Sequence, residues 1–462
     1  MNWRTLYSTQ RTGEPAPKSF GADTVRNSFQ RDYDRIIFSS AFRRLQNKTQ
    51  VFPLPGAIFV HNRLTHSLEV ASVGRSLGKA AGEQIAQKYS NESSAFTEFY
   101  KYELASVIAS ACLAHDIGNP PFGHSGEDAI RAFFQGADGD VRRVLEESMT
   151  PNQRKDLEQF EGNSNALRVL THHFNEHERG GYRLTYTTIA SLVKYPCSSS
   201  AGFSKTGLIA TKKSGFFDSE AATYAAIAQT LDIPKIDGYD GVYARHPFVY
   251  LTEAADDICY RVIDMEDAHR LHIITLETFM EMFLPFFENE QDYNSRAYIE
   301  KKLANIVDEN QKVQYIRARW IGLMIDKVSK VFMDHEQELL NGTLEKDLLK
   351  CLPEGDRKLI DNINKFSVKH IYNYRAVVEI EIAGYNVIGG LLKELVHAVL
   401  KPELPKSGKL IKLIPAQFPV NADGTNIYGD IQSVVDFISG MTDLYAIDIY
   451  RKITGITIPE IR

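Results

Sequence analysis

The chain has 462 residues and a formal net charge of −6; 43% of its residues are hydrophobic and 24% are charged. These fractions are those of an ordinary globular protein, and the acidic balance argues against a general nucleic-acid coat without excluding a local basic groove. The four cysteines form no CxxC pair, which argues against both a zinc ribbon and a disulfide framework.

The first half of the chain begins with an irregular arm over residues 1–22. The first residues of the arm lack the apolar segment that is typical of a signal peptide. The longest apolar run of the chain, residues 104–114, is too short to span a bilayer. We therefore expect a soluble, cytoplasmic protein. A long helix is predicted from about Asn62 to Gln87, and it carries His66 on its apolar stripe at helical spacing from Val70, Val73, Leu77 and Ala81.

A second helix, from Leu104 onward, is apolar on several sides and is therefore expected to be buried. It ends at His115-Asp116, so both side chains emerge in the interior. A charged pair at a buried helix end is costly unless another charge compensates it, and a divalent metal is the usual compensation.

A Gly/Pro-rich turn follows, because Gly118 ends this helix and Pro120-Pro121 prevents its continuation. Ser125 is expected to cap a new helix over residues 129–134. This places His124 just before the helix and Glu127 in its first turn.

In the remainder of the chain, residues 136–162 are charged and are predicted to be mobile or peripheral, and residues 195–215 to form a long loop. Helical patterns return over 247–267 and dominate from 276 to the end, including 320–332, 365–400 and 431–452. Short β-compatible pieces, such as 410–415, are too few to build a sheet, and no repeat is visible. The sequence therefore predicts an all-α fold.

Side chains that could bind a metal recur at buried or half-buried helix positions: His66, His115, Asp116 and one of the pair Asp256-Asp257. Two imidazoles and two carboxylates suit Mg²⁺, Mn²⁺ or Fe²⁺ with open coordination positions. Each piece alone is also compatible with a satisfied core histidine or a solvated acidic face. Their joint occurrence with His124 and Glu127 favours a functional site.

The pattern His66 … His115-Asp116 … Asp256 resembles the HD metal-dependent phosphohydrolase superfamily. The sequence segments 63–69, 115–127 and 253–258 are similar to those of its deoxyguanosine triphosphate triphosphohydrolase branch. The segments 43–51 and 381–385 extend this similarity over most of the chain. The resemblance implies an HD-domain helical fold with an additional C-terminal helical region. Its parts would be an N-terminal arm and helix contributing to the active site (1–60), the HD domain (61–273) and a phosphohydrolase-associated region (274–462).

The activity that the resemblance implies is metal-dependent cleavage of dGTP, or another dNTP, into deoxynucleoside and intact triphosphate, with Mn²⁺ or Mg²⁺. The implied metal ligands are His66, His115, Asp116 and Asp256. Asp256 is preferred to Asp257 because the family motif places the ligand four residues before a tyrosine, here Tyr260. His124 and Glu127 resemble the family's catalytic pair, and the direction of proton transfer by His124 stays open.

Substrate contacts are implied in the same way. Arg63 resembles the family's phosphate-contacting arginine, with Lys194 and either Lys212 or Lys213 as further cations, and Gln50 resembles a residue near the sugar 3′-hydroxyl, with Asn163 close by. Asp256, Tyr260 and Asp264 share one helix face with successive members about 6 Å apart along the axis. Tyr260 would pack on the deoxyribose, leaving little room for a 2′-hydroxyl, and Asp264 would address the triphosphate end or the sugar.

Two other functions stay open at this point. One is an HD phosphohydrolase for another nucleotide, such as a nucleoside monophosphate or a cyclic nucleotide. The other is a non-catalytic HD protein that senses nucleotides or binds nucleic acid; the complete ligand set argues against it. The resemblance also implies homo-oligomeric rings, often hexamers, and in some members a response to dNTP effectors or single-stranded DNA. Base preference stays open.

Overall fold

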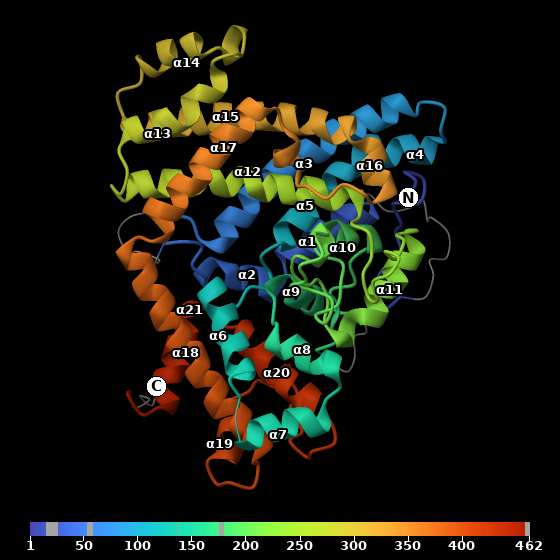
Figure 1. Cartoon of the computed structure of the whole chain (residues 1–462), viewed down its shortest axis with the longest axis vertical. Helices are drawn as coiled ribbons and strands as arrows, with labels where there is room; N and C mark the ends of the chain where they lie inside the picture. Colours follow the sequence, from blue (N-terminus) through green and yellow to red (C-terminus); the bar gives the residue numbers. More distant parts are fainter. Residues whose placement is uncertain (15–25, 53–58, 138, 175–179, 458–462) are drawn as a thin grey trace.

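The computed structural model describes residues 1–14, 26–52, 59–137, 139–174 and 180–457. Figure 1 shows an elongated molecule in which long helices cross the upper part and a second group of helices forms the lower part. Within the described residues there is no β-strand, and the β structure consists of isolated bridges. The predicted all-α fold is confirmed.

The α-helices of the first half are α1 (Ser28–Ile37), α2 (Ser40–Arg44), α3 (Arg63–Lys88), α4 (Ser94–Glu98), α5 (Leu104–Ala114), α6 (His124–Gln135), α7 (Gly139–Ser148), α8 (Pro151–Glu158), α9 (Gly162–Thr171) and α10 (Tyr186–Leu192). Those of the second half are α11 (Ala221–Thr230), α12 (Pro247–Arg270), α13 (Leu276–Phe283), α14 (Arg296–Leu303), α15 (Glu309–Asp334), α16 (Glu336–Asn341), α17 (Glu354–Ser367), α18 (Arg375–Leu400), α19 (Ser407–Ile411), α20 (Ile427–Ser439) and α21 (Asp443–Ile453). Short 3-10 or π-helical segments lie at Leu45–Asn47, Phe99–Glu103, Ile209–Thr211, Asp218–Glu220, Leu284–Phe287, Asp292–Asn294, Leu348–Cys351 and Val368–Tyr372.

The close packing of α3 on α5 brings the two predicted ligand helices together. The α3 helix starts at a capping box: the Asn62 side-chain oxygen accepts from the Thr65 backbone N–H, and the Thr65 hydroxyl oxygen accepts from the Asn62 backbone N–H. Gly74 lets α5 approach closely, because a Cβ added there would lie 2.4 Å from Cys112 Sγ. His66 lies two helical turns before Gly74, so it faces the end of α5.

The α12 helix is the central element of the upper part. It begins with Pro247 at its first position, where a missing N–H costs nothing, and packs against α3, α5 and α15. Most of its side chains are buried, which matches its lack of a clearly polar face. This position brings Asp256 to the middle of the molecule.

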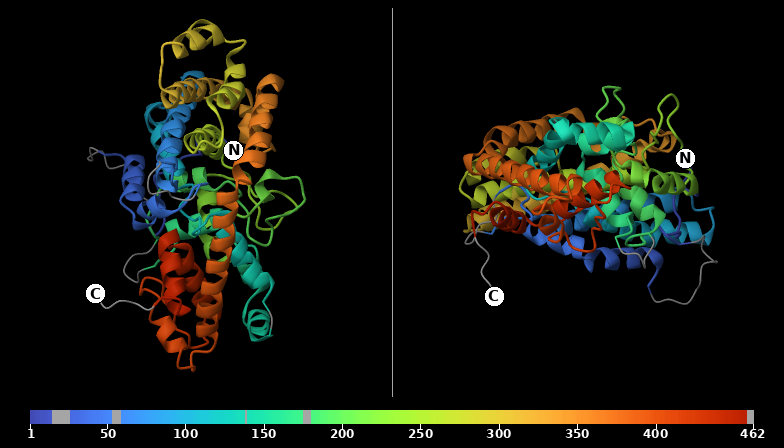
Figure 2. Two further views of the ribbon diagram at one scale, coloured as in Figure 1. Left: turned by 90° about the vertical axis from the view of Figure 1, so that its left-hand side faces the viewer. Right: turned by 90° about the horizontal axis from the view of Figure 1, so that it is seen from below.

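Two hydrophobic cores correspond to the two parts of the molecule. The larger unites α3, α5, α12 and α15, whereas the smaller unites α6, α7 and α8 with α18 and α20. Figure 2 shows α18 (orange) beside the C-terminal helices (red), and α18 packs against α6, α20 and α21. The C-terminal helices therefore support the helix that carries His124.

One local prediction is wrong. The α6 helix begins at His124 rather than after a Ser125 cap, because Gly123, at φ 57°, makes the turn and the Ser125 hydroxyl donates to the Glu381 carbonyl instead. Segment 136–162, predicted to be mobile or peripheral, contains α7 and α8, whose Val141, Leu145 and Leu157 are buried in the smaller core. The first two residues of the β-compatible piece at 410–415 belong to the end of α19, in agreement with the all-α prediction.

The other organisational predictions fare differently. Residues 195–215 form a loop with one short 3-10 turn, as expected. Part of the irregular arm, residues 15–22, lies outside the described residues, and the boundaries at 60 and 273 stay a prediction. In the described part of the chain, no helix combines the length and apolar character needed to cross a membrane.

Candidate active site

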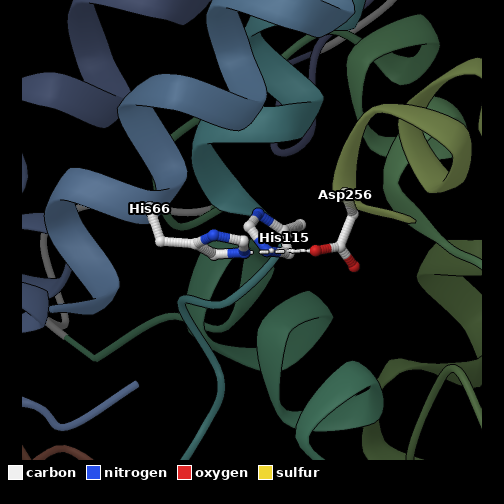
Figure 3. A group of neighbouring side chains, drawn as sticks. All are labelled: His66, His115 and Asp256. Carbon is white, nitrogen blue, oxygen red and sulfur yellow. Dashed lines mark hydrogen bonds and ion pairs between the residues drawn. The ribbon is translucent and has the colours of Figure 1, made fainter. Parts of the chain in front are cut away.

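Three ligand-type side chains converge where α3, α5 and α12 meet. His66 Nε2 lies 3.2 Å and His115 Nε2 lies 3.4 Å from Asp256 Oδ1. Figure 3 shows the two imidazoles and the carboxylate pointing toward one point from three different helices. Their ligand atoms all lie within 4.8 Å of one another, which is a spacing that a single divalent ion could bridge.

The histidine His115 is oriented for coordination. Its Nδ1 lies 2.6 Å from the Cys112 carbonyl oxygen, so the Nδ1–H donates there and Nε2 is the ring nitrogen that faces Asp256. Although burial favours the neutral imidazole, the charges of Asp116 and Asp256 raise the pKa of His115. The donor set of imidazole nitrogens and carboxylate oxygens therefore fits a divalent metal.

Asp116 lies at the edge of this cluster. Its Oδ1 is 3.6 Å from His115 Nε2 and accepts from Asn119 Nδ2 at 2.6 Å, while its Oδ2 accepts from Arg63 Nη1 at 2.7 Å. Although burial favours the neutral acid, the charges of Arg63 and His115 hold the pKa of Asp116 well below its ordinary value. Asp116 is therefore an anion at every physiological pH.

The two neighbouring aspartates of α12 have different partners. Asp256 Oδ2 accepts from Lys194 Nζ at 2.7 Å, and the charges of Lys194 and His115 overcome burial and hold the pKa of Asp256 well below its ordinary value. Asp257 instead pairs with Arg261 at 3.2 Å, and burial raises its pKa to about 6. The structure brings Asp256, not Asp257, next to the imidazoles.

His124 and Glu127 form a pair at the start of α6. His124 Nδ1 lies 3.1 Å from Glu127 Oε2, and the other Glu127 oxygen accepts from the Gly162 backbone N–H at 2.8 Å. The hydrogen bond to Glu127 raises the pKa of His124. The Glu127 side chain is 1% exposed whereas that of His124 is 80% exposed, so the buried carboxylate fixes an imidazole that reaches solvent.

A cavity of about 580 Å³ collects these groups together with every other predicted site residue. Its volume lies within the range of about 300 to 1,000 Å³ of small-molecule sites. It is lined by the predicted substrate residues Gln50, Arg63, Asn163, Lys194, Lys213, Tyr260 and Asp264. Lys212, the alternative to Lys213, lines a neighbouring cavity instead.

The cations of the cavity each contact a carboxylate. Besides the Arg63–Asp116 and Lys194–Asp256 pairs, Lys213 Nζ lies 3.0 Å from Glu161 Oε1. Asn163 Nδ2 donates to the same oxygen at 2.6 Å. Donor capacity remains, because the buried Arg63 Nε has no hydrogen-bond partner among the residues that the structure describes.

At the end of the cavity formed by α12 and the segment before α18, two tyrosines and a carboxyl group lie together. Tyr372 Oη donates to Asp264 Oδ2 at 2.7 Å, and Tyr260 Oη donates to Asn364 Oδ1 at 3.3 Å. Burial raises the pKa of Asp264 to about 7. Gln50 also lines this cavity, and its buried Oε1 has no hydrogen-bond partner within the described parts of the chain.

Sequence reasoning missed Glu161, Tyr372 and Asn119. Glu161 is fully buried and contacts Lys213 and Asn163, Tyr372 contacts Asp264, and Asn119 contacts Asp116. Asn119 could have been found, because it stands three residues after a ligand in the same turn. Glu161 and Tyr372 carry no motif signal, and the charged partner of Glu161 lies 52 residues away while the partner of Tyr372 lies 108 residues away.

The chain is similar to known proteins along nearly its whole length. The HD domain family matches residues 63–198 and the phosphohydrolase-associated domain family matches residues 350–452. A Pseudomonas aeruginosa protein described as a deoxyguanosinetriphosphate triphosphohydrolase-like protein is 36% identical, and the similarity covers 100% of both chains. A Synechocystis sp. protein with the same description is 35% identical over 99% of this chain and 100% of its own. A Cronobacter sakazakii protein described as a deoxyguanosinetriphosphate triphosphohydrolase is 30% identical over 99% of this chain and 98% of its own.

Proposed function

Because the chain belongs to the deoxyguanosinetriphosphate triphosphohydrolase-like family of HD-domain phosphohydrolases, we propose that it is a metal-dependent dNTP triphosphohydrolase. It would hydrolyse dGTP, and other dNTPs that fit the cavity, to the deoxynucleoside and inorganic triphosphate. The convergence of His66, His115 and Asp256 beside the His124–Glu127 pair, in one cavity, carries this proposal.

His66, His115, Asp116 and Asp256 would hold the metal, for which Mn²⁺ and Mg²⁺ suit the mixed nitrogen and oxygen donors. When bound by these residues, a divalent ion would supply Lewis acidity for activating water and for offsetting negative charge on a phosphoryl group. The tautomer fixed by the Cys112 carbonyl supports the ligand role of His115 Nε2.

His124 would move the proton of the reaction at its Nε2 atom, since Nδ1 is engaged by Glu127. The buried carboxylate favours the charged imidazolium, which supports donation of a proton to the departing 5′-oxygen of the nucleoside. Attack at the α-phosphorus with loss of that oxygen leaves the three phosphates joined.

The triphosphate would be bound by Arg63, Lys194 and Lys213. Each of these cations contacts a carboxylate of the site, which holds its positive charge in the cavity where the phosphate groups would lie. Guanidinium N–H groups not used by Asp116 remain for phosphate oxygens.

The deoxyribose would lie against Tyr260, with Gln50, Asp264 and Asn163 as polar neighbours. Gln50 Oε1 has no hydrogen-bond partner among the described residues and could accept from a sugar hydroxyl, because a buried acceptor without a partner is costly. A tyrosine ring against the sugar edge leaves little room for a 2′-hydroxyl, which favours dNTPs over ribonucleotides.

Further parts of the proposal rest on family membership alone. They are a homo-oligomeric assembly, with a hexamer as the leading form, a dNTP effector or single-stranded DNA as a regulator, and a location in the cytoplasm.

The test is a panel of the four dNTPs and the matching ribonucleotides with Mn²⁺, with Mg²⁺ and with chelator. We expect deoxynucleoside and intact triphosphate from dGTP in the presence of metal and none with chelator. A nucleoside monophosphate and a cyclic nucleotide are assayed in parallel. Release of phosphate from the monophosphate, or ring opening of the cyclic nucleotide to a monophosphate, without cleavage of any dNTP would indicate a different HD phosphohydrolase. Binding of nucleotides without turnover would indicate a sensor.

A further inference from the structure

The turn between α5 and α6 connects the two halves of the site. We call residues 117–123 the catalytic loop, because Asp116 precedes it and His124 follows it directly. Its conformation determines the position of the proton-transfer pair, His124 and Glu127, relative to the metal-binding cluster, which consists of His66, His115, Asp116 and Asp256. The groups that hold this loop therefore matter for turnover, even where they touch no substrate.

Asp443, in the first turn of α21, holds the loop from the C-terminal side. Its Oδ1 accepts from the Phe122 backbone N–H at 3.0 Å and its Oδ2 from the Thr49 backbone N–H at 2.8 Å. Asp443 is only 5% exposed. One buried carboxylate thus hydrogen-bonds to the backbones of both Phe122 and Thr49, which lie close before His124 and directly before Gln50 in the chain.

The loop needs such an anchor because its backbone is strained. Phe122 has a φ of 62°, in the left-handed region that bulky residues rarely adopt. Its ring packs against Gly384 of α18, where an added Cβ would lie 2.4 Å from Phe122 Cγ. Its ring and its backbone are therefore both held by the C-terminal helices.

Lys48 makes a second connection of the same kind. Its buried Nζ donates to the Asn119 carbonyl at 2.6 Å and to the Ser439 carbonyl at 2.8 Å. Asn119 belongs to the catalytic loop and Ser439 ends α20. The loop is thus tied to α20 as well as to α21.

We propose that Asp443 is a positioning residue, which fixes the positions of Gln50 and His124 relative to each other in the cavity. The inference rests on the proposed function and adds a role for the C-terminal helices within it. Asp443 lines no part of the cavity, so it acts through the two backbone amides and not on the substrate.

The chain offers a matched control in Asp430. It lies in the first turn of α20, is 3% exposed, and its two oxygens accept from the backbone N–H groups of Asn421 and Ala422, each at 2.8 Å. Those amides lie far along the chain from the catalytic loop and outside the cavity lining. Asp443→Asn and Asp430→Asn therefore each remove a buried carboxylate charge that accepts two backbone hydrogen bonds, one beside the catalytic loop and one away from it.

We expect both variants to lower the melting temperature by similar amounts, but only Asp443→Asn to lower kcat, by about tenfold to a hundredfold. KM should rise less than kcat falls, and bound metal should stay at the wild-type level, since the metal-binding cluster is untouched. Asp443→Glu keeps the charge and moves the oxygens by one methylene, so it should fold and still lose kcat. Wild-type kcat in folded Asp443→Asn or Asp443→Glu would overturn the inference.

Failure of the proposed function is distinguishable from failure of this inference. If the wild-type protein cleaves no dNTP, the proposed function fails, and hydrogen exchange at the Thr49 and Phe122 amides then tests the anchor without substrate. Faster exchange at both amides in Asp443→Asn than in Asp430→Asn supports the inference, and unchanged exchange overturns it.

Discussion

Replacing Asp264 by Asn should make the metal-free protein more stable at alkaline pH while making it a worse enzyme. Asp264 is 3% exposed and accepts a hydrogen bond from Tyr372 Oη, but it forms no ion pair with any residue that the structure describes. Its charge is therefore buried with a hydrogen bond but without an ion pair to offset the loss of solvation. The folded protein carries this cost because, in the proposed function, the carboxyl group faces the substrate.

The size of the effect follows from the pKa. Burial raises the pKa of Asp264 from 3.8 to about 7. At about 1.4 kcal/mol per unit of pKa, full ionisation costs the folded state about 4 kcal/mol relative to the unfolded chain. Since the folded pKa is raised, the stabilising contribution of the protonated acid is complete below pH 3.8 and is lost as the pH rises through about 7.

The assay is urea unfolding of both proteins in chelator, at several pH values from about 5 to about 8. Over this interval the wild-type protein should lose about 3 kcal/mol of stability that Asp264→Asn keeps. An Asp361→Asn variant, which changes an exposed aspartate of α17, should follow the wild-type curve. Parallel curves for Asp264→Asn and the wild type would refute the argument that this carboxyl group is buried and uncompensated.

Other substitutions test separate parts of the site. His124→Ala should lower triphosphate release by at least about a hundredfold with unchanged metal content, and near-normal turnover would remove His124 from the proposed mechanism. Lys213→Met should raise KM for dGTP about tenfold in steady-state kinetics, whereas Lys212→Met, in the neighbouring cavity, should leave KM unchanged. Equal effects of the two substitutions on KM would contradict the assignment of triphosphate binding to Lys213. Gly384→Ala should cost about 1 to 3 kcal/mol in thermal unfolding and lower kcat, because its new methyl group overlaps the catalytic-loop phenylalanine. Gly389→Ala, on the same helix with no neighbour within 4 Å, should instead gain up to about 1 kcal/mol, and the same sign for both variants would contradict the packing described.

The helices that carry the ligands could be predicted from the sequence, because strong local patterns fix them. The stripe after His66 and the apolar run before His115 correspond to α3 and α5. The charge of segment 136–162 predicts a mobile or peripheral segment, whereas its few apolar residues are buried in a core shared with α6, α18 and α20. Only the folded chain shows that pairing.

The site residues divide in the same way. His66, His115 and Asp256 carry motif signals, and the structure brings them together at one point. Glu161 and Asp443 carry none, since each acts on partners from distant segments and a buried aspartate or glutamate looks like any other in the sequence. The start of α6 was misplaced because a Ser cap is a common signal, whereas the left-handed turn at Gly123 depends on the strained loop before it.

The most direct test of the proposed function is hydrolysis of dGTP with Mn²⁺ in ¹⁸O-labelled water, with mass analysis of both products. Attack at the α-phosphorus predicts intact triphosphate carrying one ¹⁸O atom and unlabelled deoxyguanosine in equal amounts. Release of pyrophosphate or single phosphate, or label in the deoxyguanosine, would contradict it.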